Sequence, residues 1–599
     1  MKKELFITIG EYFVALAAGT VFYIIPVTSS TLHNGLTTAK YFTLLPLLVI
    51  FAAAVTLHMA GRLRNRTASY RLTATDAVAG LGLAYYLLNT ALWGTADPMR
   101  LIFAAGMGMW YAGLRILFTS ERIFRVLLLI LLLAAGYEAA LGILQSCGER
   151  VSNHALYAAT GTFYNPGPYG GFLAVFLPVA LYGMLRRLSA EHPLYRWVAG
   201  SVFFLSLVIL PITMSRTAWA AALAGCGAVI VVRYFSTLRL FASCHRKLYL
   251  GMAVGAGVML IAGATATWHM KRDSAEGRLL IWKNSTRMIG EQPVLGCGFG
   301  RFAGAYGEEQ AAYFAAAPRA EREVLVAGTP DDAFNEYLHI TTEGGLVGGL
   351  LFVLAAGFCL YGLWRRRAST GGLFFGAVSL LVFAFASYPF SLAEFLLAGV
   401  FLLAAAAPAA RGIRVNRYVA FLFWAVVMLP LTFVLWRHEK PREKAYREWH
   451  TDHMMYGMKL YEQVARSAKE QYPLLKAEPA FLYEYGHSLH FTGDYAGSNA
   501  ILTEGAALSA DPMFRNVMGN NYKALGDPSR AESCYLRAYY MVPNRIYPLY
   551  LLAKLYRETG QTDKLEPMCR RVLDFQEKVT SPATMEIKRE VATWHSENQ

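Results

Sequence analysis

A polar stretch between residues 331 and 348 carries side chains that could do acid–base chemistry. Asn335, His339 and Glu343 recur at every fourth position, so on a helix they share one face, and Glu336 lies next to that face. An imidazole with an intrinsic pKa near ~6.5 can act as a base at neutral pH. The alternative role is structural, with His339 capping the helix or forming hydrogen bonds within a bundle. The sequence leaves both roles open.

Two arginines stand in segments that could meet one substrate. Arg216 follows Thr213-Met-Ser at the mouth of an apolar helix, and Arg278 opens an amphipathic helix. A permanent charge at a membrane boundary is costly unless it is paired or hydrated. The alternative is an interface anchor, because long Arg side chains reach out of the membrane in that role. A guanidinium grips phosphate oxygens through two parallel hydrogen bonds, so two of them suit a diphosphate.

Two turn-rich stretches accompany these side chains. Residues 161–168 contain Asn165-Pro and Gly-Pro pairs, which break helices and set tight turns. Their alternative role is plain re-entry into the next helix. Residues 293–300 are rich in glycine but lack the preceding strand and the Lys-Ser/Thr pair of a phosphate-binding loop. We expect those glycines to permit tight turns.

The elements that must position these side chains are membrane helices. Of the 599 residues 55% are hydrophobic and 16% charged, which is too apolar for a soluble chain of this length. A helix needs ~20 apolar residues to cross the hydrocarbon layer. This criterion predicts about 13 spans, centred near residues 15, 51, 85, 109, 135, 178, 204, 226, 257, 353, 380, 400 and 427. The first block lacks a small-residue cleavage site, so we expect an uncleaved helix rather than a signal peptide.

Basic residues favour one side of these spans. They occupy alternate short loops, so the net charge of +15 does not form one soluble patch for nucleic acid. By the positive-inside rule the Arg-rich loops and the amino terminus are cytoplasmic. These loops contain Arg62, Arg64, Arg66 and Arg71; Arg186, Arg187 and Arg196; Arg233, Arg239, Arg246 and Lys247; Arg365, Arg366 and Arg367; and Arg411, Arg414 and Arg417. Residues 147–167, the Ser215-Arg216 junction, the long stretch 268–340 and the chain after Trp436 are then external.

The seven cysteines show no metal-ligand spacing. Cys226 and Cys359 fall inside apolar blocks and are expected to be small buried hydrophobes. Cys147 and Cys297 fall on the external side, where an oxidising compartment would allow a disulfide between them. Sequence alone leaves that pairing open.

The chain changes character after Trp436, and residues 437–599 are soluble in composition. Glycines 493, 526 and 560 recur at spacings of 33 and 34 residues, the period of tetratricopeptide helix pairs. Stacked helix pairs make a concave surface, which favours binding of a protein or a glycan acceptor. His450 and His453 beside Asp452 could be drawn as a metal site, but without further ligands a solvated helix face is the simpler interpretation. The predicted fold is all-α, with a transmembrane bundle in residues 1–436 and an α-solenoid in 437–599.

The order of these motifs resembles the O-antigen ligase and polymerase superfamily over roughly residues 130–405. The motifs are Gly-x-Phe-x-Asn-Pro at 161–166, Ser-Arg at 215–216, Arg-x-x-x-Trp at 278–282, Pro-x-x-Gly-x-Gly at 293–298, Asn-x-Tyr-Leu at 335–338 and Glu-x-Gly-x-x-Gly at 343–348. Glu138 and Gln145 belong to the same region. All of these motifs lie on the predicted outer face.

The resemblance implies a membrane glycosyltransferase of the multi-helix type called GT-C, which works without a metal ion or another cofactor. Such enzymes pass a glycan from an undecaprenyl-diphosphate carrier to an acceptor hydroxyl. Arg216 and Arg278 would then hold the lipid diphosphate and stabilise the leaving group. Asn335 matches the Asn of the family's His-Asn pair, Asn165 lies in the matching turn, and Glu394 is a further polar group expected to line the cavity.

The sequence departs from the family at Phe334, which stands where the family has its catalytic His. A phenyl ring cannot take a proton. His339, Glu336 and Asp332 are the remaining candidates for a base, in that order. Alternatively, transfer needs no strong base if stabilisation of the leaving group dominates.

The leading functional hypothesis is glycan transfer at the periplasmic face of a bacterial inner membrane, with lipid A core or a protein hydroxyl as acceptor. Polymerisation of repeat units on the same carrier is a second enzymatic hypothesis. A polysaccharide transporter or flippase is the alternative from another class. Transporters place ionisable residues near the bilayer midplane and show related repeats, whereas Arg216, Arg278 and Asn335 fall at the predicted outer boundary. The C-terminal repeats would recruit an acceptor or a protein partner.

Overall fold

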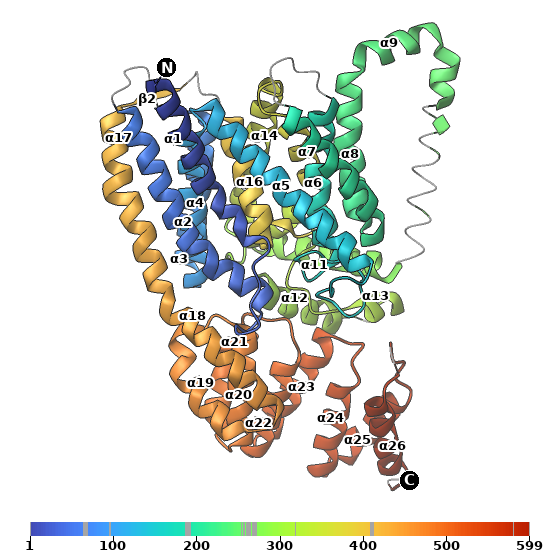
Figure 1. Cartoon of the computed structure of the whole chain (residues 1–599). Coiled ribbons are helices and arrows are strands. Elements are labelled where there is room, and N and C mark those ends of the chain that lie inside the picture. The colour runs from blue at the N-terminus through green and yellow to red at the C-terminus, as the bar shows by residue number, and fades with distance from the viewer. Residues whose placement is uncertain are drawn as a thin grey trace.

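A bundle of long helices stands on a smaller helical domain in the computed structural model (Figure 1). The structure describes residues 2–63, 70–94, 97–185, 193–252, 254–255, 258, 265, 272–317, 319–407, 412–578 and 580–597. Nearly all regular structure in these ranges is helical, which confirms the all-α prediction. The exception is one antiparallel ribbon that pairs β1 (Tyr70–Leu72) with β2 (Ile413–Val415).

The predicted apolar spans fall on helices wherever the structure describes them. The bundle consists of α1 (Lys2–Gly19), η1 (Thr20–Ile24), α2 (Gly35–Arg62), α3 (Ala74–Leu92), α4 (Pro98–Leu117), α5 (Glu121–Ser146), α6 (Pro166–Leu185), α7 (Pro193–Ile209), η2 (Leu210–Thr213), α8 (Arg216–Arg233), α9 (Phe235–Cys244), α14 (Glu336–Arg365), α15 (Leu373–Ala384), η3 (Pro389–Ser391), α16 (Ala393–Ala406), α17 (Arg417–Phe423), the π-helical turn η4 (Trp424–Met428) and α18 (Leu429–Gly457). Residue 257, the centre of the ninth predicted span, lies outside the described residues, as do most of the positions that follow it up to residue 271.

Within the described ranges, seven helices are long and apolar enough to cross a membrane. They are Gly35–Arg62, Glu121–Ser146, Pro166–Leu185, Pro193–Thr213, Arg216–Arg233, Glu336–Arg365 and Arg417–Gly457. Three shorter apolar helices accompany them, at Thr8–Ile24, Leu373–Ala384 and Ala393–Ala406. The chain is therefore a multi-pass membrane protein, while the count of about 13 crossings stays a prediction.

The described Arg-rich loops gather at one end of the bundle, beside the amino terminus and opposite the C-terminal domain (Figure 1). There Arg62 donates to Thr119 at 2.6 Å, and the β1–β2 ribbon places Arg71 opposite Arg414. We call this end, with Arg62, Arg71, Arg115, Arg366 and Arg414, the Arg-rich end. The one-sided charge follows the predicted pattern, and the assignment of that side to the cytoplasm stays a prediction.

Small residues let the helices around α6 pack closely. Gly171 on α6 faces Phe383 of α15, and a Cβ at this glycine would lie 2.1 Å from the phenyl ring. A Cβ at Gly225 on α8 would lie equally close, 2.1 Å from the Ser379 hydroxyl oxygen. Close approach of small residues is how membrane helices gain packing energy without a hydrophobic driving force. This tightly packed core gives a rigid base to the loops at the end opposite the Arg-rich end.

The external stretch expected at residues 268–340 folds into α11 (Arg272–Glu291), α12 (Phe302–Ala316) and α13 (Glu321–Val326). These helices lie at the end of the bundle that faces the C-terminal domain (Figure 1). Arg515 and Arg537 of that domain both pair with Glu308 on α12. Asn544 donates to the carbonyl groups of Val324, Leu325 and Ala327 at 2.8–3.0 Å. The two parts therefore share a specific polar interface.

The C-terminal domain is a stack of helical hairpins that begins inside α18, which runs without a break through Trp436. Its further helices are α19 (Tyr461–Leu475), α20 (Pro479–Phe491), α21 (Tyr495–Ala506), α22 (Met513–Ala524), α23 (Pro528–Met541), α24 (Tyr547–Glu558), α25 (Thr562–Leu573) and α26 (Pro582–Glu597). Gly493, Gly526 and Gly560 follow the ends of α20, α22 and α24 and have positive φ of 85°, 76° and 70°. The repeated glycine thus closes the same turn in each hairpin.

The structure describes all four cysteines that the sequence singled out. Cys147 and Cys297, whose pairing the sequence left open, are both free thiols. Cys226 and Cys359 pack against the core but are half-buried rather than fully buried. The interpretation of His450 and His453 as a solvated face is also only partly right, because His453 contacts Glu484 at 2.5 Å and lies beside the ring of His33.

Candidate functional site

A large cavity opens between the bundle and the C-terminal domain. Its volume is about 2040 Å³, roughly twice the ~1,000 Å³ at the upper end for small-molecule pockets. Its wall is formed by α3, α4, α14, α16 and the start of α20, with the 162–168 loop at one side. Acidic, basic and histidine side chains near the C-terminal domain are Lys40, Asp97, Arg100, Asp331, Asp332, Glu336, His339, Glu343, Glu394, Lys476, Glu478 and Glu504. Carboxylates therefore dominate this end.

The predicted polar helix face lies on this wall. The α14 helix begins at Glu336 because Asn335 caps it, its side-chain oxygen accepting from the Leu338 amide at 3.2 Å. Such a cap satisfies one of the amides that a helix start leaves without a partner. Asn335 is buried and does not line the cavity. Its side chain serves the helix start in this structure.

His339 joins two neighbouring segments. Its Nδ1 accepts the Ala333 amide at 3.3 Å, and its Nε2 lies 3.5 Å from Glu343 Oε2, as expected for residues four apart on a helix. The other oxygen of Glu343 accepts the amides of Gly300 and Phe302 at 2.9 and 3.1 Å. Both ring nitrogens of His339 thus contact protein groups. These contacts support the structural role that the sequence left open.

The glycine-rich loop packs on a kink of α14. Gly345 interrupts the helix with φ 63°, and the loop amides of Cys297 and Gly298 bond to carbonyl groups one turn before it at 2.9 Å. Gly296, Gly298 and Gly300 have φ of 67°, 97° and 82°, which L side chains rarely adopt. A Cβ at Gly296 would lie 2.5 Å from α14 backbone atoms. These glycines permit tight turns, as predicted.

Two carboxylates reach the cavity around the start of α14. Glu336 Oε1 accepts the Phe390 amide at 2.7 Å, and Asp332 Oδ1 accepts from the Ser391 hydroxyl at 2.6 Å. Both partners belong to the turn around η3, so this turn and α14 hold each other. Tyr388, just before η3, also lines the cavity. Its burial, and to a smaller extent the charge of Asp332, raises the pKa of the Tyr388 hydroxyl to about 12, so it stays protonated at neutral pH.

The two predicted phosphate-binding arginines come together beside this cavity. Arg278 donates to the Ala386 carbonyl at 2.8 Å and to the Thr217 hydroxyl at 3.5 Å, next to Arg216. Burial, followed by the charge of Arg216, lowers the pKa of the Arg278 guanidinium. Two like charges held close favour a bound anion. Neither Arg216 nor Arg278 lines the large cavity itself.

Phe334 stands between the arginines and the cavity. Its ring lies 5.3 Å below the Arg278 guanidinium and makes an edge contact with Tyr388 at 5.3 Å between ring centroids. Phe334 thus makes a cation–π contact with Arg278. Of the eight predicted site residues, Asn165, Asp332, Glu336, His339 and Glu394 line the cavity, whereas Arg216, Arg278 and Asn335 do not.

An ion pair that sequence reasoning missed lies across the cavity from α14. Lys40 on α2 pairs with Glu394 at the start of α16, and both side chains are buried, with 5% and 3% exposed. Lys40 also donates to the carbonyl of Thr162 at 3.1 Å and lies over the ring of Phe163. The available signal was a single lysine inside an apolar span, where a charge marks function or a buried partner.

The same network fixes the turn at residues 161–168. Glu138 accepts the Thr162 amide at 3.0 Å and its hydroxyl at 2.6 Å, while Gln145 binds the backbone of residues 160 and 161. Asn165 Oδ1 accepts the Gly167 amide at 2.9 Å, and the Asn165 side chain lies beside Tyr388. The turn is therefore held from α5 and α2, with Asn165 at the cavity wall.

Residues 201–353 match a family model described as O-antigen ligase. The matched segment contains Arg216, Arg278, Asp332, Glu336 and His339, and so includes both the arginine pair and the start of α14. The match supports a relationship to O-antigen ligases and glycan transfer at the level of that family. No curated protein shows a significant match to the chain.

Proposed function

We propose that the protein transfers a glycan from an undecaprenyl-diphosphate carrier to an acceptor hydroxyl at the end of the bundle that carries the C-terminal domain, on the periplasmic face of a bacterial inner membrane. The observation that carries the proposal is the arginine pair beside the carboxylate-lined cavity, within the segment that matches O-antigen ligases. A diphosphate leaving group needs positive charge, and a hydroxyl nucleophile needs a proton acceptor.

The bonds made and broken assign a task to each group. The acceptor oxygen forms a bond to the anomeric carbon, and the bond from that carbon to the diphosphate oxygen breaks. Negative charge grows on the diphosphate, where Arg216 and Arg278 would stabilise it. The acceptor proton passes to a carboxylate at the cavity wall. Glu336 and Asp332 suit that task because both line the cavity, whereas His339 holds Ala333 and Glu343.

The guanidinium groups also account for charge that a divalent cation would otherwise supply. We therefore expect transfer by the purified protein to continue in the presence of EDTA. Loss of transfer in EDTA, with recovery on addition of Mg²⁺, would contradict this part of the proposal.

The C-terminal domain resembles a tetratricopeptide array, and we propose that it binds the acceptor or a protein partner. The 33- and 34-residue spacing of its turn glycines and the polar interface with α12 and α13 support this role. Lipid A core and a protein hydroxyl are the two acceptor classes considered. Glu478, just before α20, and the first residues of α20 line the cavity and bring this domain to the edge of the site.

Deletion of the gene, followed by profiling of carrier-linked glycans, lipopolysaccharide and glycoproteins, tests the reaction. Carrier-linked glycan accumulates and one acceptor class loses its glycan if the protein is a ligase. Shortened chains on an acceptor that is still modified would indicate the polymerase instead. Accumulation on the inner side of the membrane would indicate a flippase, and no accumulation would refute the proposal.

The arginine pair is tested with Arg278→Ala in the full chain. We expect a rate loss of about 10²-fold or more, the size seen when a group that stabilises developing charge is removed. Arg272→Ala is the matched control, because Arg272 lies on the same helix but pairs with Glu276 at the surface. Equal activity of the two variants would remove the diphosphate role. Glu336→Gln, Asp332→Asn and His339→Ala, assayed beside them, separate the base candidates.

A further inference from the structure

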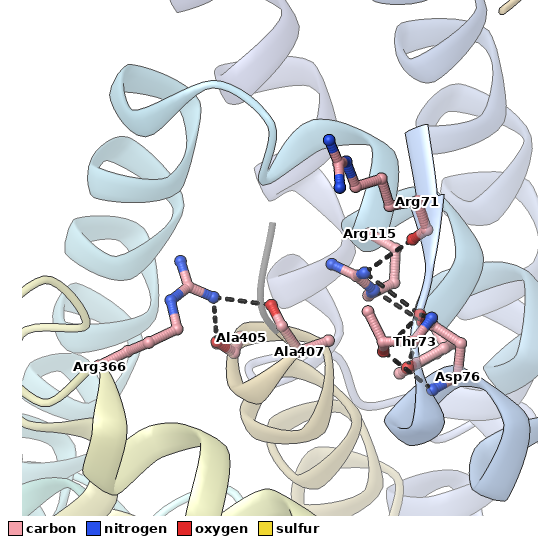
Figure 2. A network of polar contacts seen from close by, with 8 residues as sticks. Arg71, Thr73, Asp76, Arg115, Arg366, Ala405 and Ala407 are labelled. Carbon is pink, nitrogen blue, oxygen red and sulfur yellow. Dashed lines mark hydrogen bonds and ion pairs between the residues drawn. The ribbon is translucent and has the colours of Figure 1, made fainter. Parts of the chain in front are cut away.

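The large cavity continues to the Arg-rich end of the bundle, away from the carboxylates near the C-terminal domain. Arg71, Arg115 and Arg366 line it there. Figure 2 shows Arg366 on one side of this space and Arg71 and Arg115 on the other. Among the described residues that line this end, Asp76 contributes the one carboxylate. The basic side chains thus outnumber the acidic ones.

Asp76 is already fully used by its neighbours. Arg115 donates to both of its oxygens, at 2.7 and 3.2 Å, and the Tyr111 hydroxyl donates to it at 2.7 Å. Asp76 also closes a capping box with Thr73 at the start of α3. Arg115 in turn donates to the carbonyl of Arg71 at 3.2 Å. This carboxylate therefore serves Arg115 and the start of α3.

Arg366 is held in place by backbone alone. Its Nη1 donates to the carbonyl groups of Ala405 and Ala407 at 2.8 Å each, at the C-terminal end of α16 (Figure 2). No carboxylate of the described residues lies within ion-pair distance of Arg366. Burial, followed by the charge of Arg115, lowers the pKa of Arg366. Figure 2 shows the two guanidinium groups on opposite sides of the same space. An anion between them would relieve this repulsion.

The cavity between the two charged ends is apolar. Its wall there consists of residues from α3, α4, α14, α16 and α17, including Leu83, Met107, Leu396, Val400, Leu403 and Phe423. A narrow apolar space inside a membrane protein accepts hydrocarbon, and a basic pocket at the end of the helices accepts an anionic headgroup. The combination matches an amphiphile with one phosphate at its head.

We propose that the Arg-rich end binds the phosphate of an anionic membrane phospholipid through Arg71, Arg115 and Arg366, with a hydrocarbon chain of that lipid in the apolar part of the cavity. The site is separate from the proposed transfer chemistry at the other end. Free phosphate shares the headgroup chemistry but cannot use the apolar wall. Lipid binding is thus distinguished from binding of a free anion because only lipid affinity depends on a hydrocarbon chain.

The test is titration of the purified full-length protein with phosphatidylglycerol, phosphatidylcholine and inorganic phosphate, with bound molecules counted by native mass spectrometry. Arg366→Gln and Arg71→Gln are each expected to weaken phosphatidylglycerol binding about fivefold, the factor for one basic residue near an anionic lipid. Arg366→Lys is expected to retain most binding. Arg367→Gln is the matched control, because Arg367 does not line the cavity and stacks on the Trp364 ring at 4.3 Å instead.

Three outcomes would overturn the proposal. They are equal binding of phosphatidylcholine, an equal loss in Arg367→Gln, and displacement of the lipid by millimolar inorganic phosphate. Val400→Trp, which fills the apolar part, provides a second measurement. We expect it to weaken long-chain phosphatidylglycerol more than a dihexanoyl analogue with the same headgroup. Equal weakening of the two lipids would show that the chain does not occupy the cavity.

Discussion

Replacing Lys40 by methionine leaves the carboxylate of Glu394 buried without its cation. The two side chains are only 5% and 3% exposed, so water cannot substitute for the lost ammonium group. Removal of one partner from a buried pair costs ~3–5 kcal/mol. Two hydrogen bonds from Lys40 to Thr162 are lost as well. Against a typical stability of ~5–15 kcal/mol this is a large effect.

The double variant Lys40→Met, Glu394→Leu separates charge from packing. Because no unpaired charge remains, most of the loss in the free energy of unfolding should be recovered, leaving a deficit below ~2 kcal/mol. Glu394→Gln alone should cost less than Lys40→Met, since Lys40 keeps its bonds to the Thr162 carbonyl and hydroxyl.

Unfolding in mixed micelles with graded SDS, followed by tryptophan fluorescence, measures these free energies. Arg125→Met provides the control, because Arg125 and Glu121 form a pair that is 53% and 67% exposed. Breaking such a pair costs at most ~1 kcal/mol. If Lys40→Met were no less stable than Arg125→Met, or if the double variant showed the full sum of the single losses, the buried-pair argument would be wrong.

Three further changes test other contacts. Burial, with smaller effects of His453 and His450, lowers the pKa of His33 to about 4. The unfolded chain therefore binds a proton more readily than the folded chain. The contribution of His33 to stability should be complete above pH ~6.5 and fall as the pH drops towards 4. In thermal unfolding, His33→Phe should reduce this dependence of stability on pH, and an unchanged dependence would contradict the prediction. Gly161→Ala should lower the melting temperature more than Gly148→Ala. Both glycines have positive φ, but a Cβ at Gly161 would lie 2.2 Å from Glu138 Oε2, whereas a Cβ at Gly148 would meet no atom within 4 Å. Gly304→Val should weaken the contact between α12 and the C-terminal domain, since a Cβ at Gly304 would lie 2.0 Å from the Ala507 carbonyl oxygen. Limited proteolysis should release the C-terminal domain faster from this variant than from the control Gly290→Ala, whose Cβ would meet no neighbour.

The broad architecture could be predicted because it depends on local composition. Apolar length placed every described span on a helix, and Arg-rich loops gathered at one end because their charge cannot enter the hydrocarbon layer. The repeat period located the turns that end α20, α22 and α24, because a positive φ at such a turn selects glycine. The face shared by His339 and Glu343 follows from helical spacing alone, and their contact at 3.5 Å agrees with it.

The site itself depends on contacts between distant segments, which spacing does not encode. Lys40 and Glu394 are 354 positions apart, so neither residue points to the other in the sequence. The arginine pair could be anticipated as a pair, but not its place beside the cavity rather than in its wall, because that depends on how α8, α11 and the turn after α15 pack. Likewise Asn335 was a substrate-binding candidate through the family resemblance, and only the start of α14 shows that it caps a helix.

Phe334 connects these observations. Its φ of 50° is an outlier for a bulky residue, and such strain costs ~1–3 kcal/mol and persists where the surroundings hold it. The surroundings here are aromatic and cationic: a cation–π contact with Arg278 contributes ~0.5–2 kcal/mol, and the edge contact with Tyr388 contributes ~0.5–1.5 kcal/mol. These contacts are large enough to offset the strain. In this conformation the phenyl ring contacts Arg278, while Asp332 and Glu336, two residues before and after Phe334, both line the cavity. A phenyl ring at this position is therefore compatible with the proposed transfer, in which Arg278 would stabilise the leaving group and a neighbouring carboxylate would take the proton.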